Sequence, residues 1–160
     1  MIAGSELVQV SDGKRSKVST LFKKQKPGAP AEMLLYNIHD NVFNAAAVRL
    51  PIVKVVGDRD SFRLTTKGGK TVVCSEDQMF WCRVNGIDKV MSLHNIRSIQ
   101  NYASAVELRV MDDKGNSSWE QLQGVEQMGI EGEEFFSITP GMFRAAVVGG
   151  GLMISETSSI

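Results

Sequence analysis

The sequence predicts an all-β domain made of many short strands and hairpins, with little helix. Short apolar runs recur along the chain, and Gly, Pro, Asn and Asp separate them at the spacing typical of β-sandwich and barrel-like folds. No segment keeps the apolar period of about 3.6 residues that an amphipathic helix shows. The 160 residues suit one domain, 1–160, without a linker or an internal repeat.

The N-terminal part is expected to hold strands joined by polar turns. An apolar run over 7–10 ends at the turn Ser11-Asp12-Gly13, and a further strand follows over 18–21. Residues 22–30 are rich in Lys, Pro and Gly and are predicted to form a loop. Further strands are expected over 33–37 and within 43–56, where Pro51 marks a break.

Hairpins dominate the centre of the chain. The strongest signal is Asn85-Gly86 between 80–84 and 87–91, because a two-residue hairpin turn needs positive φ angles, which Asn and Gly tolerate. Glycine-containing turns predict two more hairpins, which pair 61–66 with 71–74 and 105–110 with 117–122.

The C-terminal part is again predicted to be β-structure, with few candidates for helix anywhere in the chain. Strands are expected over 135–139, 143–148 and 152–155. Only 93–102 and 44–48 have weak helical character.

Composition excludes several classes of function. Formal net charge is +0, so the chain as a whole does not attract polyanions, and no apolar run approaches the roughly 18 residues of a membrane span. Without a signal peptide and with only two cysteines, a reducing compartment is expected: the cytoplasm, or a virion if the protein is phage-encoded. Two scattered histidines give no zinc signature, and no cofactor is expected. His39-Asp40 is interpreted as a turn, because neighbours on a strand point to opposite faces.

The stretch 14–26 is strongly basic and contains no acidic residue. It could contact nucleic acid or an acidic partner, but only Phe22 interleaves with it, so a solvated loop is the preferred interpretation. Acidic residues around 126–134 lie towards the other end, and this asymmetry would suit head-to-tail contacts between subunits or protein partners. The basic residues are Lys14, Arg15, Lys17, Lys23, Lys24 and Lys26.

The opening residues Met1-Ile2-Ala3-Gly4-Ser5-Glu6-Leu7-Val8, followed by a turn with Asp-Gly, carry the most informative pattern of the sequence. This block resembles the start of the Hedgehog/intein (Hint) family, which typically begins Cys-Ile/Leu-x-Gly-Asp/Ser-Thr-x-Val. In that family residue 1 is the nucleophile. Here Met1 offers a thioether with no ionisable proton, so the resemblance extends to the scaffold and not to the reacting atom.

Two further blocks are similar to the same family, and together the resemblance covers about 1–157. After a hairpin, Ser75 falls where the family has Thr and Gln78 falls where it has the His that donates to the scissile amide. In the closing strand, Ser155 replaces the penultimate His and Glu156 replaces the terminal Asn whose amide nitrogen cyclises. Thr157 stands where the first downstream residue would be a nucleophile.

The resemblance implies a horseshoe-shaped Hint-like fold whose reaction positions are altered together. We therefore expect a stand-alone domain without catalysis that serves as a structural, assembly or interaction protein, a phage virion component being one such context. The alternative is a residual autoprocessing domain in which Cys74 or Ser75 supplies the nucleophile and a cut falls near Thr157 or Ser158. For Cys74 a small buried side chain at a strand end is the preferred interpretation.

Overall fold

The computed structural model describes residues 1–11, 14–26, 28–38, 46–55, 57, 59–112, 114–129, 134–141 and 144–157, and within these it leaves out the side chains of 46–47 and 156–157. The predicted turn at His39-Asp40 lies outside the described residues. The described chain is dominated by strands, as predicted. The strands are β1 (Ile2–Ala3), β2 (Leu7–Ser11), β3 (Lys14–Lys17), β4 (Ala31–Asn37), β5 (Ala46–Leu50), β6 (Ile52–Val55), β7 (Ser61–Thr66), β8 (Thr71–Cys74), β9 (Gln78–Val84), β10 (Ile87–Ser92), β11 (Val106–Met111), β12 (Ser117–Gly129), β13 (Phe135–Ile138), β14 (Arg144–Val148) and β15 (Leu152–Thr157).

The three predicted hairpins are confirmed. β9 and β10 pair in antiparallel register around Asn85 and Gly86, whose φ angles of 52° and 77° suit a two-residue hairpin turn. β7 pairs with β8, and β11 pairs with β12, which runs on to pair with β7. The predicted break at Pro51 separates β5 from β6.

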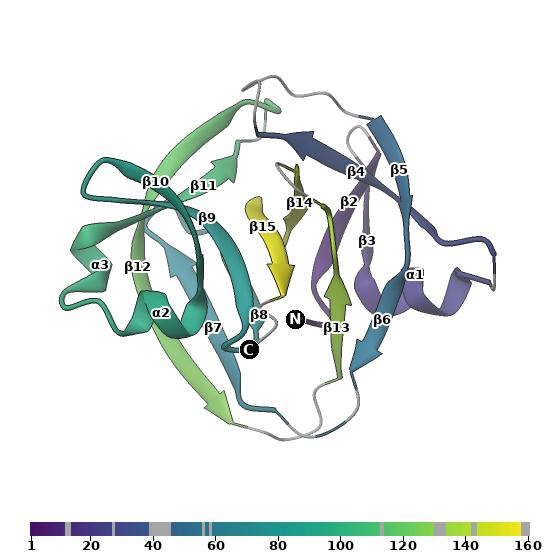
Figure 1. Ribbon diagram of the computed structural model, residues 1–160, viewed down its shortest axis with the longest axis horizontal. Helices are drawn as coiled ribbons and strands as arrows, with labels where there is room; N and C mark the ends of the chain where they lie inside the picture. Colours follow the sequence, from purple (N-terminus) through teal and green to yellow (C-terminus); the bar gives the residue numbers. More distant parts are fainter. Residues whose placement is uncertain are drawn as a thin grey trace.

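The strands form one curled antiparallel sheet that brings the two ends of the chain together. Its order is β3-β2-β14-β15-β9-β11-β12-β7-β8-β1-β13-β6, so the last strand, β15, lies beside β9 and the first strand, β1, lies between β8 and β13. In Figure 1 the sheet wraps around the centre of the molecule, and the N-terminus and the end of β15 lie close together there. This arrangement places residues from both ends of the sequence next to the β8–β9 connection.

A helix that the sequence analysis did not predict, α1 (Val18–Lys24), replaces the expected strand over 18–21 and part of the expected loop over 22–30. Tertiary contacts explain it: Val18 is fully buried, and the Phe22 ring packs on Phe136 with ring centroids 5.2 Å apart. The first helical amides donate to the Gly4 and Glu6 carbonyls, which replaces a side-chain cap. A seven-residue helix depends on such packing, because its own hydrogen bonds are too few.

The other two helices lie inside the predicted segment 93–102 and just beyond it. They are α2 (Leu93–Arg97) and α3 (Tyr102–Ala105). The second helical candidate, 44–48, was wrong for its described part, because 46–48 belongs to β5, which pairs with β4. Residues 44–45 lie outside the described residues.

The hydrophobic core lies inside the curl of the sheet, and it fixes which side chains of β9 are buried. Gln78, Phe80 and Cys82 are fully buried, while the residues between them are partly exposed. Cys74 and Cys82 are both buried and both free, so the described chain contains no disulfide. Gln78 therefore enters the core on the same face as its apolar neighbours, and its amide needs buried partners.

Candidate functional site

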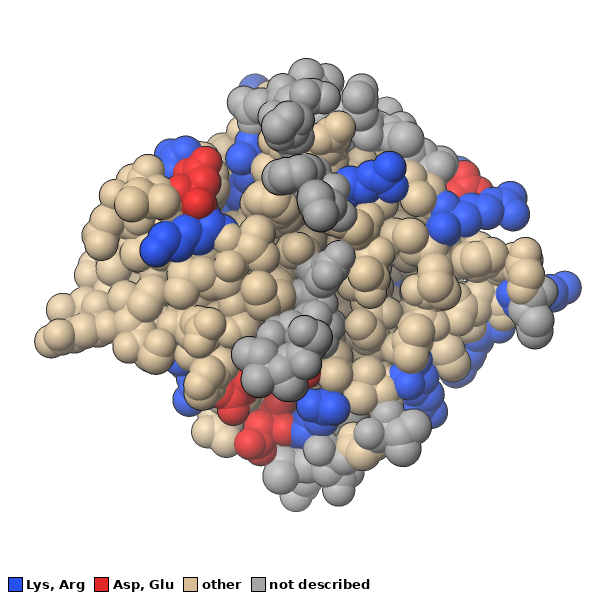
Figure 2. Space-filling model, viewed as in Figure 1, with Lys and Arg blue, Asp and Glu red and all other residues tan. Residues whose placement is uncertain are grey.

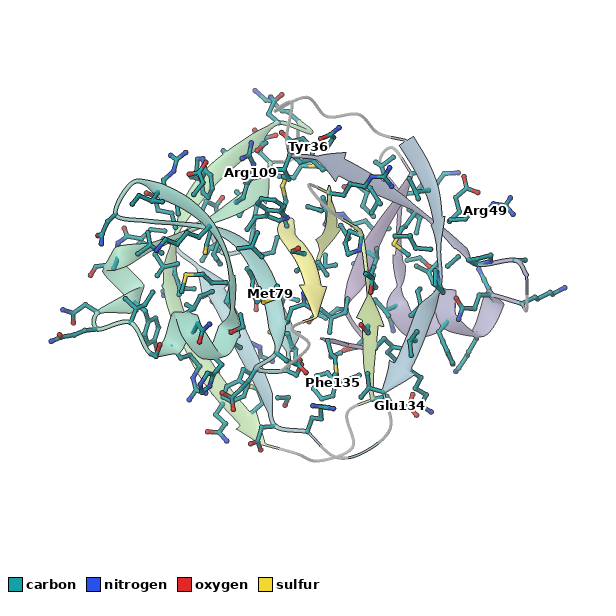
Figure 3. All side chains as sticks on the ribbon, in the orientation of Figure 1. Tyr36, Arg49, Met79, Arg109, Glu134 and Phe135 are labelled. Atoms are coloured by element: carbon teal, nitrogen blue, oxygen red, sulfur yellow. The ribbon has the colours of Figure 1, made fainter. Side chains whose placement is uncertain are left out.

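The candidate site is the connection between β8 and β9, onto which the first residues of the chain fold. β1 is held there by backbone pairing, since Ile2 lies opposite Cys74 and the Ser75 amide donates to the Met1 carbonyl at 3.0 Å. The backbone amide of Gln78 donates to the Ser75 carbonyl at 3.3 Å, which closes a tight turn before β9. Figure 3 labels Phe135 on β13, which pairs with β1, and Met79 on β9, the strand that follows this connection.

The Gln78 side chain joins the two ends of the chain. Its Oε1 accepts a hydrogen bond from the Met1 amino nitrogen at 2.8 Å. Its Nε2 donates to the Ser155 carbonyl on β15 at 3.0 Å and to the Met79 carbonyl at 3.0 Å. The resemblance predicted that Met1, Gln78 and Ser155 belong to one site, and the structure brings them together. Both polar atoms of the buried amide are thus satisfied within the chain.

Asp77 and Arg59 complete the site, and the sequence analysis did not single them out. The Asp77 carboxylate lies 3.4 Å from the Met1 amino nitrogen, 3.5 Å from Arg59 Nη1 and within hydrogen-bond distance of Ser75 Oγ, which donates to it. Burial lowers the pKa of the Met1 amino group below its ordinary value of 8.0, and the Asp77 charge only partly opposes this. We call Met1, Ser75, Asp77, Gln78 and Ser155 the Gln78 junction.

The turn at the junction is clamped from outside by α2. The His94 amide donates to the Glu76 carbonyl at 2.9 Å, and His94 Nδ1 lies 2.9 Å from Glu76 Oε2. Arg97 reaches the same carboxylate oxygen at 3.2 Å and stacks on the Phe62 ring at 4.3 Å. His94 therefore supports the turn. Its sequence distance from Glu76 hid this contact.

The sulfur atoms near the junction are poor nucleophiles. Cys74 is fully buried, and this burial raises the pKa of its thiol from 9.0 to about 12. Burial also raises the pKa of Cys82 to about 11. The Met1 residue packs in an apolar cluster with Ala3 and Phe135. The thiolate is the reactive form of cysteine, so neither thiol is activated at neutral pH.

The C-terminal residues that the resemblance singled out lie on β15. Ser155 is buried and its carbonyl binds Gln78, while Thr157 lies opposite Gln78 in the register of β15 with β9. The backbone of Glu156 belongs to the same strand. The side chains of Glu156 and Thr157, and all of Ser158, lie outside the described residues.

The basic residues lie apart from the hydrogen bonds of the Gln78 junction. They are distributed over β3, α1 and the following residues, and all six side chains are exposed. In the part of the chain that the structure describes, no group of three His, Cys, Asp or Glu side chains is arranged to hold a metal ion. None of the described helices is long and apolar enough to cross a membrane.

No protein-family model and no curated protein matches this sequence, whereas many solved structures match its fold. A DnaB intein from Synechocystis sp. is 19% identical, with a TM-score of 0.70, and the match covers 99% of this chain and 98% of that one. The PabCDC21-1 intein is 12% identical, with a TM-score of 0.74 and 98% of each chain covered. A KlbA intein precursor from Methanococcus jannaschii is 13% identical, with a TM-score of 0.70, covering 99% of this chain and 91% of that one.

These likenesses establish the fold. The chain has the curled, all-β Hint fold that inteins share, over almost its whole length, as the resemblance in the sequence implied.

Proposed function

We propose that this chain is a Hint-fold domain that keeps the scaffold of an intein without the splicing reaction, and that it acts as a structural, assembly or interaction protein. A phage virion is one context that would suit such a part. The observation that carries the proposal is the Gln78 side chain, which bonds to Met1 at one end and to the Ser155 carbonyl at the other.

The residues at the junction lack the chemistry that splicing needs. Splicing starts when a thiol or hydroxyl at residue 1 attacks the preceding carbonyl, and the Met1 thioether has no proton to lose. A histidine takes up and releases protons near neutral pH, whereas the Gln78 amide does neither. The Glu156 side chain has no amide nitrogen that could attack the backbone carbonyl of the same residue. When several members of a catalytic unit are replaced together, the remaining ones do not restore the reaction.

Residual autoprocessing is the second candidate, and one contact favours it. Ser75 Oγ donates to the Asp77 carboxylate and lies 3.3 Å from the Met1 carbonyl oxygen, so a hydroxyl and a base stand beside a peptide group. Against it, the Asp77 carboxylate is already engaged by Arg59 and by the Met1 amino group. Cys74 is the less suitable nucleophile because of its raised pKa.

The test is intact mass spectrometry of a precursor with one tagged segment before Met1 and another after Ile160, incubated with and without a thiol. We expect both segments to remain attached. A matched precursor carrying Met1→Cys, Gln78→His, Ser155→His and Glu156→Asn restores the reactive side chains on the same scaffold, and release of either tag from it would show that the detection works.

Release of a segment from the unaltered precursor would contradict the proposal. In that case Ser75→Ala and Cys74→Ala would identify the nucleophile, because only one of them should stop the cut. If the restored precursor also stays whole, an active intein placed between the same two tagged segments serves as the control for detection.

A further inference from the structure

A second region of the molecule, apart from the Gln78 junction, carries a group of exposed basic side chains. We call Lys14, Arg15, Lys17, Lys23, Lys24 and Lys26 the basic face; all six side chains are exposed. Figure 2 shows blue side chains around the right-hand end of the molecule, where Figure 1 places β3 and α1. The segment that carries these residues folds partly into a helix and is not the loop that the sequence predicted.

The six cations of the basic face have no ion-pair partners among the described residues, and no acidic residue interrupts the segment 14–26 that carries them. Elsewhere in the described chain, six Lys and Arg side chains each form an ion pair with Asp or Glu. These are Lys54, Arg59, Arg63, Lys70, Arg83 and Arg97. The positive potential of the basic face is therefore not neutralised locally, even though the net charge of the chain is +0.

Two grooves open between these cations. The first has a volume of about 500 Å³ and is lined by apolar side chains such as Val10 and Leu21, with Lys24 beside them. The second has a volume of about 560 Å³. It is lined by Phe22 and Pro51 together with Lys23 and Lys26. Each groove thus combines apolar lining with positive charge.

The ridge between the two grooves is held rigidly. Gln25 and Pro30 line both grooves. The Gln25 side chain donates to the Ile52 carbonyl at 2.7 Å and accepts from the Ile52 amide at 3.0 Å, which ties the ridge to β6. The grooves are therefore formed before any partner binds, and less ordering entropy is lost on binding.

The edge of the sheet borders the first groove. β3 is the first strand in the sheet order, and among the described strands it pairs only with β2. An edge strand presents backbone groups that an extended chain can pair with. One acidic residue, Glu32, lines the first groove, and it lies opposite Arg49 in the β4–β5 register. Three lysines, Lys23, Lys24 and Lys26, line the two grooves against this single carboxylate.

We propose that the basic face binds an extended acidic peptide segment of a partner protein. Its carboxylates would pair with the lysines and the arginine, and small apolar side chains between them would enter the two grooves. Nucleic acid fits less well, because the aromatic ring that lines the second groove, Phe22, is half-buried and packs against Phe136, which leaves it poorly placed for base stacking. A second copy of the chain also fits less well, since Glu126 and Glu134 pair with cations of their own chain.

The proposal is tested with a fluorescent peptide of alternating Glu and Ala, titrated with the full chain and followed by anisotropy. A peptide with Gln in place of Glu and a single-stranded DNA oligonucleotide serve as competitors. The variant Lys23→Glu, Lys24→Glu, Lys26→Glu reverses the charge of the three lysines that line the two grooves. The matched control is Lys67→Glu, Lys89→Glu, Lys114→Glu, which makes the same change in net charge at exposed lysines with no ion pair in the described chain.

We expect the basic-face variant to weaken binding of the Glu-Ala peptide by roughly tenfold or more, and the control variant to change it by less than about twofold. The Gln-Ala peptide should not compete. Equal losses in both variants, absence of binding, preferential binding of the oligonucleotide, or self-association in sedimentation that blocks the peptide would each overturn the proposal. This result is independent of the precursor experiment, because none of the residues in the basic face takes part in the hydrogen bonds of the Gln78 junction.

Discussion

The Gln78 junction and the basic face are both built from polar groups, but they use them in opposite ways. At the junction, the buried amide of Gln78 and the carboxylate of Asp77 are fully engaged by other parts of the same chain. On the basic face, six exposed cations have no ion-pair partner in the described structure. The first region is closed on itself, and the second remains open to a partner.

This difference predicts which property each region controls, the stability of the fold or the binding of a partner. Buried hydrogen bonds at the junction fix the relative position of the two chain ends, so their loss should appear as lost stability. Exposed cations contribute little to stability, so their loss should appear as lost binding. The following changes sharpen or break this comparison.

The largest effect is expected from Gly149→Ala, in the turn that carries β15 to the junction. Gly149 has a φ of 57°, and an added Cβ would overlap the Thr71 carbonyl oxygen. We expect the free energy of unfolding to fall by about 4 kcal/mol, because the backbone must move as well as accept the strained φ. Urea denaturation measures it. Gly115→Ala is the control, since its φ is 81° but nothing lies near the new Cβ; a loss there of the same size would contradict the role of the Thr71 contact.

Gln78→Leu tests the junction directly. The change keeps the size of the side chain but leaves the Met1 amino group and the Ser155 carbonyl without their amide partner. We expect a loss of about 3 kcal/mol in the free energy of unfolding, because these groups stay buried. Gln121→Leu removes a solvent-exposed bond to Ser104 and should cost less than about 1 kcal/mol. Equal losses of unfolding free energy would mean that the buried hydrogen bonds of Gln78 stabilise the fold no more than an exposed one does.

Cys74 makes the junction sensitive to alkaline pH. The thiol titrates at 9.0 when exposed and at about 12 when buried, so only the unfolded chain loses its proton between these values. The stability is complete below pH 9 and falls above it, with a slope that approaches about 1.4 kcal/mol per pH unit from this group. Denaturation at several pH values, compared with Cys74→Ala, measures the difference. Cys82 adds a smaller fall, since burial raises its pKa only to about 11.

The smallest effect on stability is expected from the basic-face variant Lys23→Glu, Lys24→Glu, Lys26→Glu. These lysines are exposed and unpaired in the described structure, so the free energy of unfolding should change by less than about 0.5 kcal/mol, apart from a slight loss of favourable charge at the C-terminus of α1. Thermal melts of the variant and the parent check this. A large loss would mean that these lysines hold the fold, and the contrast with the junction would disappear.

Much of the fold was predictable from local signals. Asn85-Gly86, the glycine turns and the alternating runs located the hairpins, because these depend on residues close in sequence. Helix α1 was missed because its sequence has no capping signal, and its stability comes from the packing of Val18 and Phe22 on distant residues. The part of the site that rests on sequence blocks, Met1, Gln78 and Ser155, was located. Asp77, Arg59 and Glu76 were not, because their roles depend on contacts that the sequence does not encode locally.

The sequence by itself determined the class of fold and the positions of the hairpins, because these follow from the identity of single residues and from short-range turn geometry. Only the tertiary structure decided that the buried Gln78 amide joins Met1 to Ser155 and that six neighbouring cations have no ion-pair partner among the described residues. Both depend on which distant strands lie side by side, and sheet order is set by the burial of the whole core rather than by any one segment.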